Sequence, residues 1–99
     1  MRMGVAGFDW DEGNRGKCRK HGVSLAEIEA LLSGTPRVAP DPAHSTAEHR
    51  FIAVGSNDAG RPMFVAFTVR LRGGERLIRP VSARYMHDKE ARRYEAEST

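Results

Sequence analysis

The chain has 99 residues, of which 29% are charged and 39% hydrophobic, and its formal net charge is +3. This length supports one modest core and excludes separate cofactor and substrate domains, so we expect a single domain over residues 1–99. No apolar run approaches the roughly 18 residues of a membrane span, and the first residues lack a signal-peptide-like apolar stretch. We therefore expect a cytoplasmic protein that does not contact a membrane.

Basic charge is concentrated toward the C-terminus. Residues 68–94 contain eight Lys or Arg and three Asp or Glu, which gives this segment a charge of +5. Guanidinium groups bind phosphate oxygens in a forked geometry, so an arginine-rich segment indicates a phosphate-bearing partner such as nucleic acid. A surface that is rich in arginine only for solubility is the alternative interpretation.

The first third of the chain predicts a short strand followed by a helix. Residues 7–11 are typical of a strand that runs into a helix start. Asp11 or Asn14 could cap the helix, which would continue to about His21. Gly22 then suits the left-handed position that commonly follows a helix.

A second helix is predicted from Ser24 to Gly34. Residues 24–27 form a capping box, and Val23 and Ile28 fit the hydrophobic staple that often accompanies one. The apolar stripe that would face the core contains Leu25, Ile28, Leu31 and Leu32. The proline-rich segment that follows predicts a loop with one short strand near Arg37–Ala39.

Three longer strands are predicted next, over Arg50–Gly55, Met63–Arg72 and Leu77–Arg84, joined by turns at residues 57–60 and 73–74. The middle strand alternates clearly. Its apolar face would contain Met63, Val65, Phe67, Val69 and Leu71, and its other face Phe64, Ala66, Thr68, Arg70 and Arg72.

The third of these strands does not alternate simply. Arg79 falls on the same side as Leu77, Val81 and Ala83, and Pro80 cannot donate a ladder hydrogen bond. An edge position, a bulge or a strand end would each resolve this. A C-terminal helix over His87–Glu97 completes the order β-α-α-β-β-β-α, which predicts an α+β fold with a small antiparallel β-sheet packed against helices.

The sequence contains no motif for a bound cofactor, and we expect none. Cys18 and His21 have the spacing of half a metal site, but no second pair matches them, so we expect no metal. Cys18 is the only cysteine, which excludes an internal disulfide. A small thiol on a short helix is more often part of the core than a nucleophile.

Four short motifs occur in order: Trp10-Asp11, Lys20-His21-Gly22, Arg79-x-x-Ser82-Ala83-Arg84 and Glu90-x-x-x-Tyr94. In this order and spacing the sequence resembles the BrnT toxins of bacterial type II toxin–antitoxin systems, over residues 8–95. The further residues that match are Phe8, Asp9, Asn14, Lys17, Val23, Asp41, Pro42, Arg50, Gly55, the apolar strand Phe64–Phe67, Ile78, Pro80 and Val81.

The resemblance implies a RelE-like fold and a ribonuclease activity that arrests translation. It also implies an antitoxin partner, BrnA, which binds operator DNA through a ribbon-helix-helix domain, so that the toxin would reach DNA only through the antitoxin. The chain departs from many members at Met86, His87 and Ala91, which leaves the identity of a general acid or base open.

Cleavage of RNA without a metal requires a base for the 2′-hydroxyl proton, an acid for the leaving oxygen and cations for the charge that grows on phosphorus. The candidate catalytic residues are His21, Arg79, Arg84, His87 and Glu90. The candidate RNA-binding residues are Lys17, Lys20, Arg70, Arg72, Ser82 and Arg93.

Several of these residues also have a structural interpretation. His21 could stabilise a helix end, and the hydroxyl of Ser82 could bond to nearby backbone. Arg79 in an apolar strand needs a partner, for which Asp9 or Glu90 is available. Glu90 could act as a base if it were buried.

A function of a different class is compatible with the same residues. The chain could be a non-catalytic module that binds an antitoxin and acts as a co-repressor, because a basic face would also bind an acidic protein segment. A plain RNA-binding domain is disfavoured, because the few aromatic residues are too scattered to form a base-stacking platform.

Overall fold

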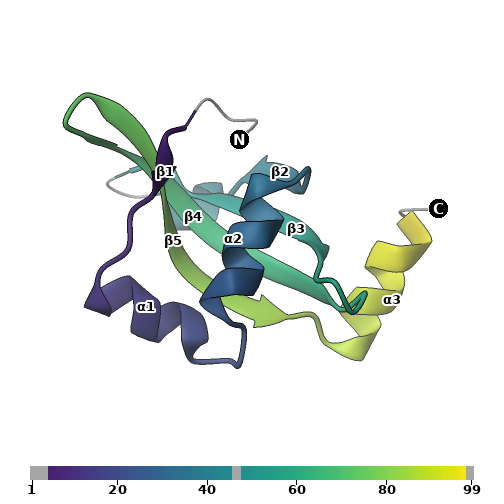
Figure 1. The fold of residues 1–99 in the computed structure, drawn as a ribbon. Coiled ribbons are helices and arrows are strands. Elements are labelled where there is room, and N and C mark those ends of the chain that lie inside the picture. The colour runs from purple at the N-terminus through teal and green to yellow at the C-terminus, as the bar shows by residue number, and fades with distance from the viewer. Residues whose placement is uncertain (1–4, 46–47, 98–99) are drawn as a thin grey trace.

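Three helices and five strands make up the described part of the chain, residues 5–45 and 48–97, in the computed structural model (Figure 1). In chain order they are β1 (Gly7–Phe8), α1 (Glu12–Arg19), α2 (Leu25–Ser33), β2 (Arg37–Pro40), the 3-10 turn η1 (Pro42–His44), β3 (Phe51–Ser56), β4 (Pro62–Arg72), β5 (Glu75–Tyr85) and α3 (Asp88–Glu97). The predicted α+β class is confirmed, and β2 is the short strand expected near Arg37–Ala39. None of the helices in these residues is long and apolar enough to cross a membrane.

Helix α1 begins at a capping box and is fixed to β5 by one amide side chain. Of the two predicted caps, Asp11 is the N-cap: the Asn14 backbone N–H donates to Asp11 Oδ1 at 3.1 Å, and the Asp11 N–H donates to Asn14 Oδ1 at 2.7 Å. Asn14 is 4% exposed, and its Nδ2 donates to the carbonyl oxygens of Asp9 and Pro80, each at 2.9 Å. The polar groups of this buried amide are thus satisfied, as burial requires.

Helix α2 has the predicted capping box between Ser24 and Glu27. Glu27 also joins three parts of the fold, because its Oε2 accepts hydrogen bonds from Asn57 Nδ2 at 2.8 Å and from the Tyr85 hydroxyl at 2.7 Å. The hydrogen bonds from Asn57 and from the Ser24 backbone lower the pKa of Glu27 to about 2. The carboxylate form of Glu27 therefore stabilises the folded chain.

Acid is expected to remove this contribution. Because the folded-state pKa of Glu27 lies below its ordinary value of 4.5, its stabilisation is complete above about pH 4.5 and is lost as the pH falls toward 2. Allowing for solvent screening, we expect about 1–2 kcal/mol of the free energy of unfolding to depend on it. Melting curves at pH 7 and pH 3 measure this: Glu27→Gln should show a smaller acid-induced drop than the wild type, and an equal drop would contradict the assignment.

The five strands form one sheet in the order β1-β5-β4-β3-β2. The expectation of an antiparallel sheet is correct for β2 to β5 and wrong for β1, which runs parallel to β5 with Gly7 opposite Leu77 and Phe8 opposite Ile78. A parallel pair needs a long crossover between its strands. Here the chain between β1 and β5 passes through two helices and three other strands. This connection is long enough for β1 to pair parallel to β5.

A β-bulge at Val81 resolves the irregular pattern of β5. Ala66 pairs with Ser82 and Phe67 pairs with Pro80, so Val81 has no partner in β4. The strand is not at an edge, because it lies between β1 and β4. An extra residue reverses the side-chain alternation beyond it. The prediction that Arg79 shares a face with Ala83 is therefore wrong.

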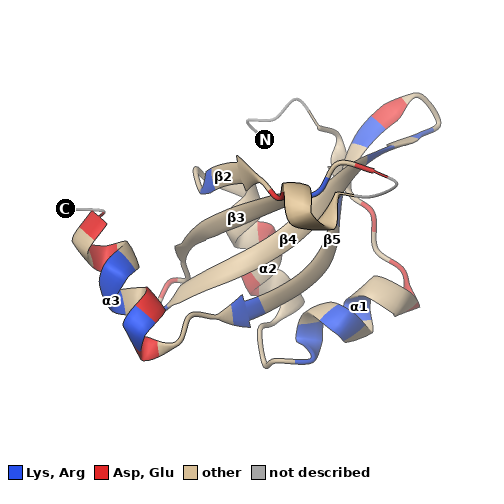
Figure 2. Cartoon of the chain, turned by 180° about the vertical axis from the view of Figure 1, so that it is seen from behind, with Lys and Arg blue, Asp and Glu red and all other residues tan. Residues whose placement is uncertain are grey.

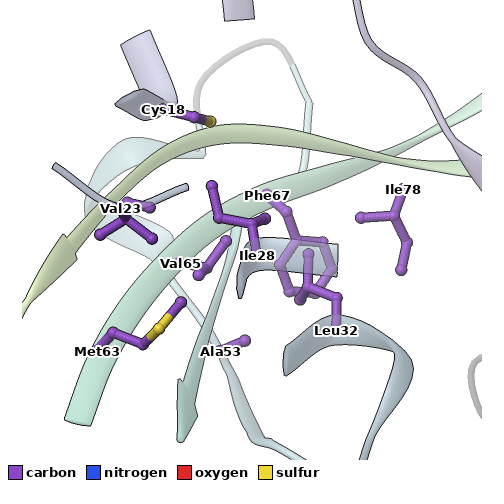
Figure 3. Close-up of a cluster of buried hydrophobic side chains, with 10 residues drawn as sticks. Cys18, Val23, Ile28, Leu32, Ala53, Met63, Val65, Phe67 and Ile78 are labelled. Carbon is purple, nitrogen blue, oxygen red and sulfur yellow. The ribbon is translucent and has the colours of Figure 1, made fainter. Parts of the chain in front are cut away.

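The core lies between one face of the sheet and the helices α1 and α2. Figure 3 shows Ile28 and Leu32 of α2 against Met63, Val65 and Phe67 of β4, and all five are at most 2% exposed. This confirms the predicted core positions of both elements over these residues. Helices α1 and α2 do not cover the opposite face of the sheet, as the view from behind shows (Figure 2), and α3 borders only its far end, in a groove with Val54 and Phe64.

Cys18 belongs to this core and extends from α1 (Figure 3). It is fully buried, and burial raises the pKa of its thiol to about 11. A thiol with this pKa is protonated at neutral pH and is a poor nucleophile. Cys18 is thus a packing residue, as expected.

Candidate active site

The bulge at Val81 gathers polar side chains on one face of β3, β4 and β5. This face, which we call the open face, is opposite the core and is the side of the sheet turned toward the viewer in Figure 2. On β5, Ile78, Pro80 and Ala83 are buried in the core. Arg79, Ser82 and Arg84 pair with Thr68, Ala66 and Phe64 of β4 and lie on the open face with them. In a regular strand Arg79 and Arg84, five residues apart, would lie on opposite faces.

Two adjoining hollows lie on the open face. The first, which we call the central groove, has a volume of about 340 Å³, and its polar lining residues are His21, Asp41, His44, Arg50, Ser82 and Arg84. The second, which we call the Thr68 pocket, has a volume of about 320 Å³, and its charged and hydroxyl lining residues are Lys17, His44, Glu48, Arg50, Thr68, Arg70 and Arg79. His44 and Arg50 belong to both, so one ligand can occupy the two hollows together.

Arg84 is held at the edge of the central groove by a carboxylate and a ring. Its Nη1 and Nη2 donate to Glu90 Oε1 and Oε2 at 2.9 and 3.1 Å, and its guanidinium carbon lies 4.6 Å from the centre of the Phe64 ring. The two-pronged contact fixes the plane of the guanidinium. The side chain of Arg84 is 39% exposed, so the group is also accessible to a ligand.

Glu90 is a positioning residue in this arrangement. Hydrogen bonds from Arg84 and from the His87 backbone lower the pKa of Glu90 to about 2. Its side chain is 36% exposed, so the burial that we required for Glu90 to act as a base is not present. A carboxylate with such a low pKa is a weak proton acceptor, and its visible role is to hold Arg84.

Arg79 is held by two aspartates, of which Asp9 was one of its two expected partners. Its Nη2 lies 2.9 Å from Asp11 Oδ2, and its Nη1 lies 3.6 Å from Asp9 Oδ2. Hydrogen bonds from the Asn14 backbone and from Arg79 lower the pKa of Asp11, which keeps it charged. Asp11 therefore both caps α1 and positions Arg79.

Two histidines from separate turns line the central groove. His21 follows α1 and is exposed, and His44 belongs to η1. The Nδ1 of His44 lies 2.9 Å from Asp41 Oδ2, an arrangement that orients the ring. Imidazole groups exchange protons near neutral pH. His44 and Arg50 were not among the predicted site residues. The signals for them in the sequence were the three-residue spacing of Asp41 and His44 and the place of Arg50 in the family resemblance.

The structure brings together about half of the predicted site residues. His21, Ser82 and Arg84 line the central groove, and Lys17, Arg70 and Arg79 line the Thr68 pocket. Arg70 is paired there with Glu48, with Nη2 and Oε1 2.9 Å apart.

The remaining predicted residues line neither hollow. Arg72 pairs with Asp9 at 3.1 Å, beside Arg79, and Lys20 is exposed just before His21. His87 precedes α3, and Arg93 on α3 lines a separate groove with Tyr94. Helix α3 lies at the end of the sheet away from the Gly73–Gly74 turn (Figure 1). The groove that Arg93 lines also contains Val54 and Phe64, so Arg93 borders the far end of the open face, outside the two hollows.

The fold and the open face define a small α+β protein with a cationic face built on three strands. Within the described residues, no three His, Cys, Asp or Glu side chains lie close enough to hold a metal ion. A family model described as "Ribonuclease toxin, BrnT, of type II toxin-antitoxin system" matches residues 10–90. The chain therefore belongs to the BrnT family of ribonuclease toxins, which confirms the resemblance and implies an antitoxin partner. No curated protein matches the sequence.

Proposed function

We propose that this chain is an endoribonuclease that binds RNA along the open face, cleaves it without a metal ion and thereby arrests translation. The observation that carries the proposal is the bulge at Val81, which puts Arg79, Ser82 and Arg84 on one accessible face. There they adjoin His21 and the other residues of the two hollows. If β5 served only to build the core, its side chains would not need to change face at the bulge.

The chemistry follows from what RNA itself supplies. RNA carries its own nucleophile, the 2′-hydroxyl, so the protein has to accept its proton, donate a proton to the leaving 5′-oxygen and stabilise the charge on the phosphate. Arg84, aimed by Glu90, and Arg50 are the cations of the central groove. His21 and His44 line the same groove and provide the groups for the two proton transfers.

The partner of this toxin is proposed to be a BrnA-like antitoxin that neutralises it by covering the open face in the cytoplasm. A segment with acidic side chains would fit the Arg and Lys residues of the two hollows, because opposite charges steer and orient such contacts. The antitoxin would contact operator DNA through a ribbon-helix-helix domain, and the toxin would reach DNA only through it.

Incubation of the pure protein with RNA in EDTA tests the proposed activity. We expect cleavage that EDTA does not reduce and that co-purified antitoxin blocks. Intact RNA at high protein concentration, with the protein shown to be folded by circular dichroism, would contradict the proposal. Cleavage that appears only after addition of Mg²⁺ would contradict its metal independence.

The same incubation with RNA distinguishes the proposed ribonuclease from the alternative function, a non-catalytic binding module. A non-catalytic antitoxin-binding module would bind the antitoxin on its open face, act as a co-repressor and leave RNA intact. Expression of the chain without its antitoxin would then leave growth unchanged, whereas the proposed ribonuclease should arrest growth and protein synthesis.

A further inference from the structure

Two residues that line the Thr68 pocket each have a buried polar atom that lacks a hydrogen-bond partner among the described residues, Thr68 Oγ1 and Arg79 Nη1. Thr68 is 3% exposed, the side chain of Arg79 is 16% exposed, and the two residues are paired across β4 and β5. Both line the same pocket. Buried polar groups in proteins nearly always make a hydrogen bond, so two neighbouring groups at one pocket that make none require an explanation.

The contacts around Arg79 show why its Nη1 makes no hydrogen bond within the described part of the chain. Arg79 Nη2 forms an ion pair with Asp11 Oδ2 at 2.9 Å. Asp9 Oδ2 accepts from both Nε and Nη2 of Arg72, at 3.2 and 3.1 Å, and stays 3.6 Å from Arg79 Nη1. Arg79 is thus fixed by Asp11, while its buried Nη1 has only the longer contact with Asp9 and makes no hydrogen bond among the described residues.

The charge of the pocket defines the kind of acceptor. Four cations line it, Lys17, Arg50, Arg70 and Arg79, against one anion, Glu48. Glu48 is paired with Arg70, and Asp11 with Arg79, so the local excess of positive charge comes from Lys17 and Arg50. The side chains of Lys17 and Arg50 make no ion pair within residues 5–45 and 48–97. A ligand with anionic oxygens can accept hydrogen bonds from the hydroxyl and the guanidinium and neutralise part of this excess.

We propose that the Thr68 pocket binds one backbone phosphate of the RNA, next to the phosphate that is cleaved in the central groove. Thr68 Oγ1 and Arg79 Nη1 donate to its non-bridging oxygens, and Lys17 adds charge from α1. The choice of RNA rests on the proposed function, whereas the phosphate chemistry rests on the pocket alone. Since the two hollows share His44 and Arg50, a strand that enters one continues into the other.

The substitution Thr68→Val tests this with little change of shape. Valine replaces only the hydroxyl, which has no partner here, so we expect the melting temperature to stay the same or rise. Affinity is measured by fluorescence anisotropy with a labelled 2′-O-methyl RNA, which keeps its backbone phosphates and cannot use its 2′-oxygen for cleavage. We expect about tenfold weaker binding, typical of a lost hydrogen bond to a charged group. Thr35→Val, at an exposed position, is the matched control and should bind like the wild type.

A titration with inorganic phosphate, followed by the NMR signals of Thr68 and of the Arg79 side chain, separates a free ion from an RNA phosphate. Shifts of both signals, together with the weaker RNA binding of Thr68→Val, support the proposal. If phosphate shifts these signals while Thr68→Val binds the RNA normally, the pocket takes a free anion and the proposal is overturned. A marked fall in the melting temperature of Thr68→Val would also overturn it, because the hydroxyl would then have a structural partner.

Arg84→Ala distinguishes this inference from the proposed activity. The variant should lose cleavage of ordinary RNA but keep the response of Thr68 and Arg79 to inorganic phosphate, because Arg84 does not line the Thr68 pocket. Absence of cleavage by the wild type would contradict the proposed activity and leave the phosphate measurements valid. An unchanged NMR spectrum with phosphate, in a protein that cleaves RNA, would contradict only the phosphate site.

Discussion

Replacing Arg84 by alanine is expected to slow RNA cleavage by about 100- to 1,000-fold, the usual loss when one preorganised donor to a transition state is removed. The guanidinium is fixed by Glu90 and the Phe64 ring at the edge of the central groove. It is therefore oriented before RNA binds and does not have to be ordered during the reaction. Initial rates of cleavage of a labelled RNA in EDTA measure the effect.

Two other variants make this result specific. Arg84→Lys keeps the charge but loses the forked geometry, so it should recover only a small part of the rate. Arg92→Ala removes an equal charge from an exposed position on α3 and should cleave at nearly the wild-type rate. The melting temperature of Arg84→Ala should fall little, because exposed ion pairs contribute little to stability. A normal rate for Arg84→Ala, or an equal loss for Arg92→Ala, would exclude Arg84 from the active site.

Replacing Phe67 by alanine is expected to reduce the free energy of unfolding by about 3–5 kcal/mol. Phe67 is fully buried in β4, pairs with Pro80 beside the bulge, and stacks on Phe51 with 5.5 Å between the ring centres. A cavity in the central strand cannot be closed by small movements of its neighbours. A drop in the melting temperature of about 12 °C or more is expected for a domain of this size.

Leu71→Ala is the matched control for this prediction, since it truncates another apolar residue of the same strand. The alternation of β4 predicts that Leu71 lies on the core face with Phe67. This is wrong, because the end of β4 that contains Leu71 extends past the helices, and Leu71 is 73% exposed. Its substitution should therefore change the melting temperature very little. Similar losses for the two variants would contradict the location of the core.

Local signals in the sequence were sufficient to predict most elements of the fold. The capping box of α2, the glycine turn between β4 and β5 and the alternation of β4 depend on neighbouring residues, so they can be found without knowledge of the rest of the chain. Gly22, predicted to be left-handed, has a φ of 88°. The parallel pairing of β1 could not be predicted in this way, because it joins residues about 70 positions apart through only two registered pairs.

The bulge is the feature of the candidate site that could not be predicted from the sequence. The irregular pattern around Pro80 showed that β5 departs from simple alternation, but an edge, a bulge and a strand end all remained open. Only the pairing with β4 identifies Val81 as the extra residue, and only then do Arg79 and Arg84 share a face. His44 lay in a segment with few structural signals, and its place in the groove depends on a turn that tertiary packing positions.

The nature of the cleavage products tests the central proposal most directly. One RNA and the same RNA with a single 2′-deoxy residue at the cleaved position should be incubated with the protein in EDTA, and the product ends identified by mass spectrometry. We expect 5′-hydroxyl and 2′,3′-cyclic phosphate ends, with no cleavage at the deoxy position. Ends that carry a 5′-phosphate, or cleavage at the deoxy position, would contradict a mechanism in which the RNA supplies its own nucleophile on the open face.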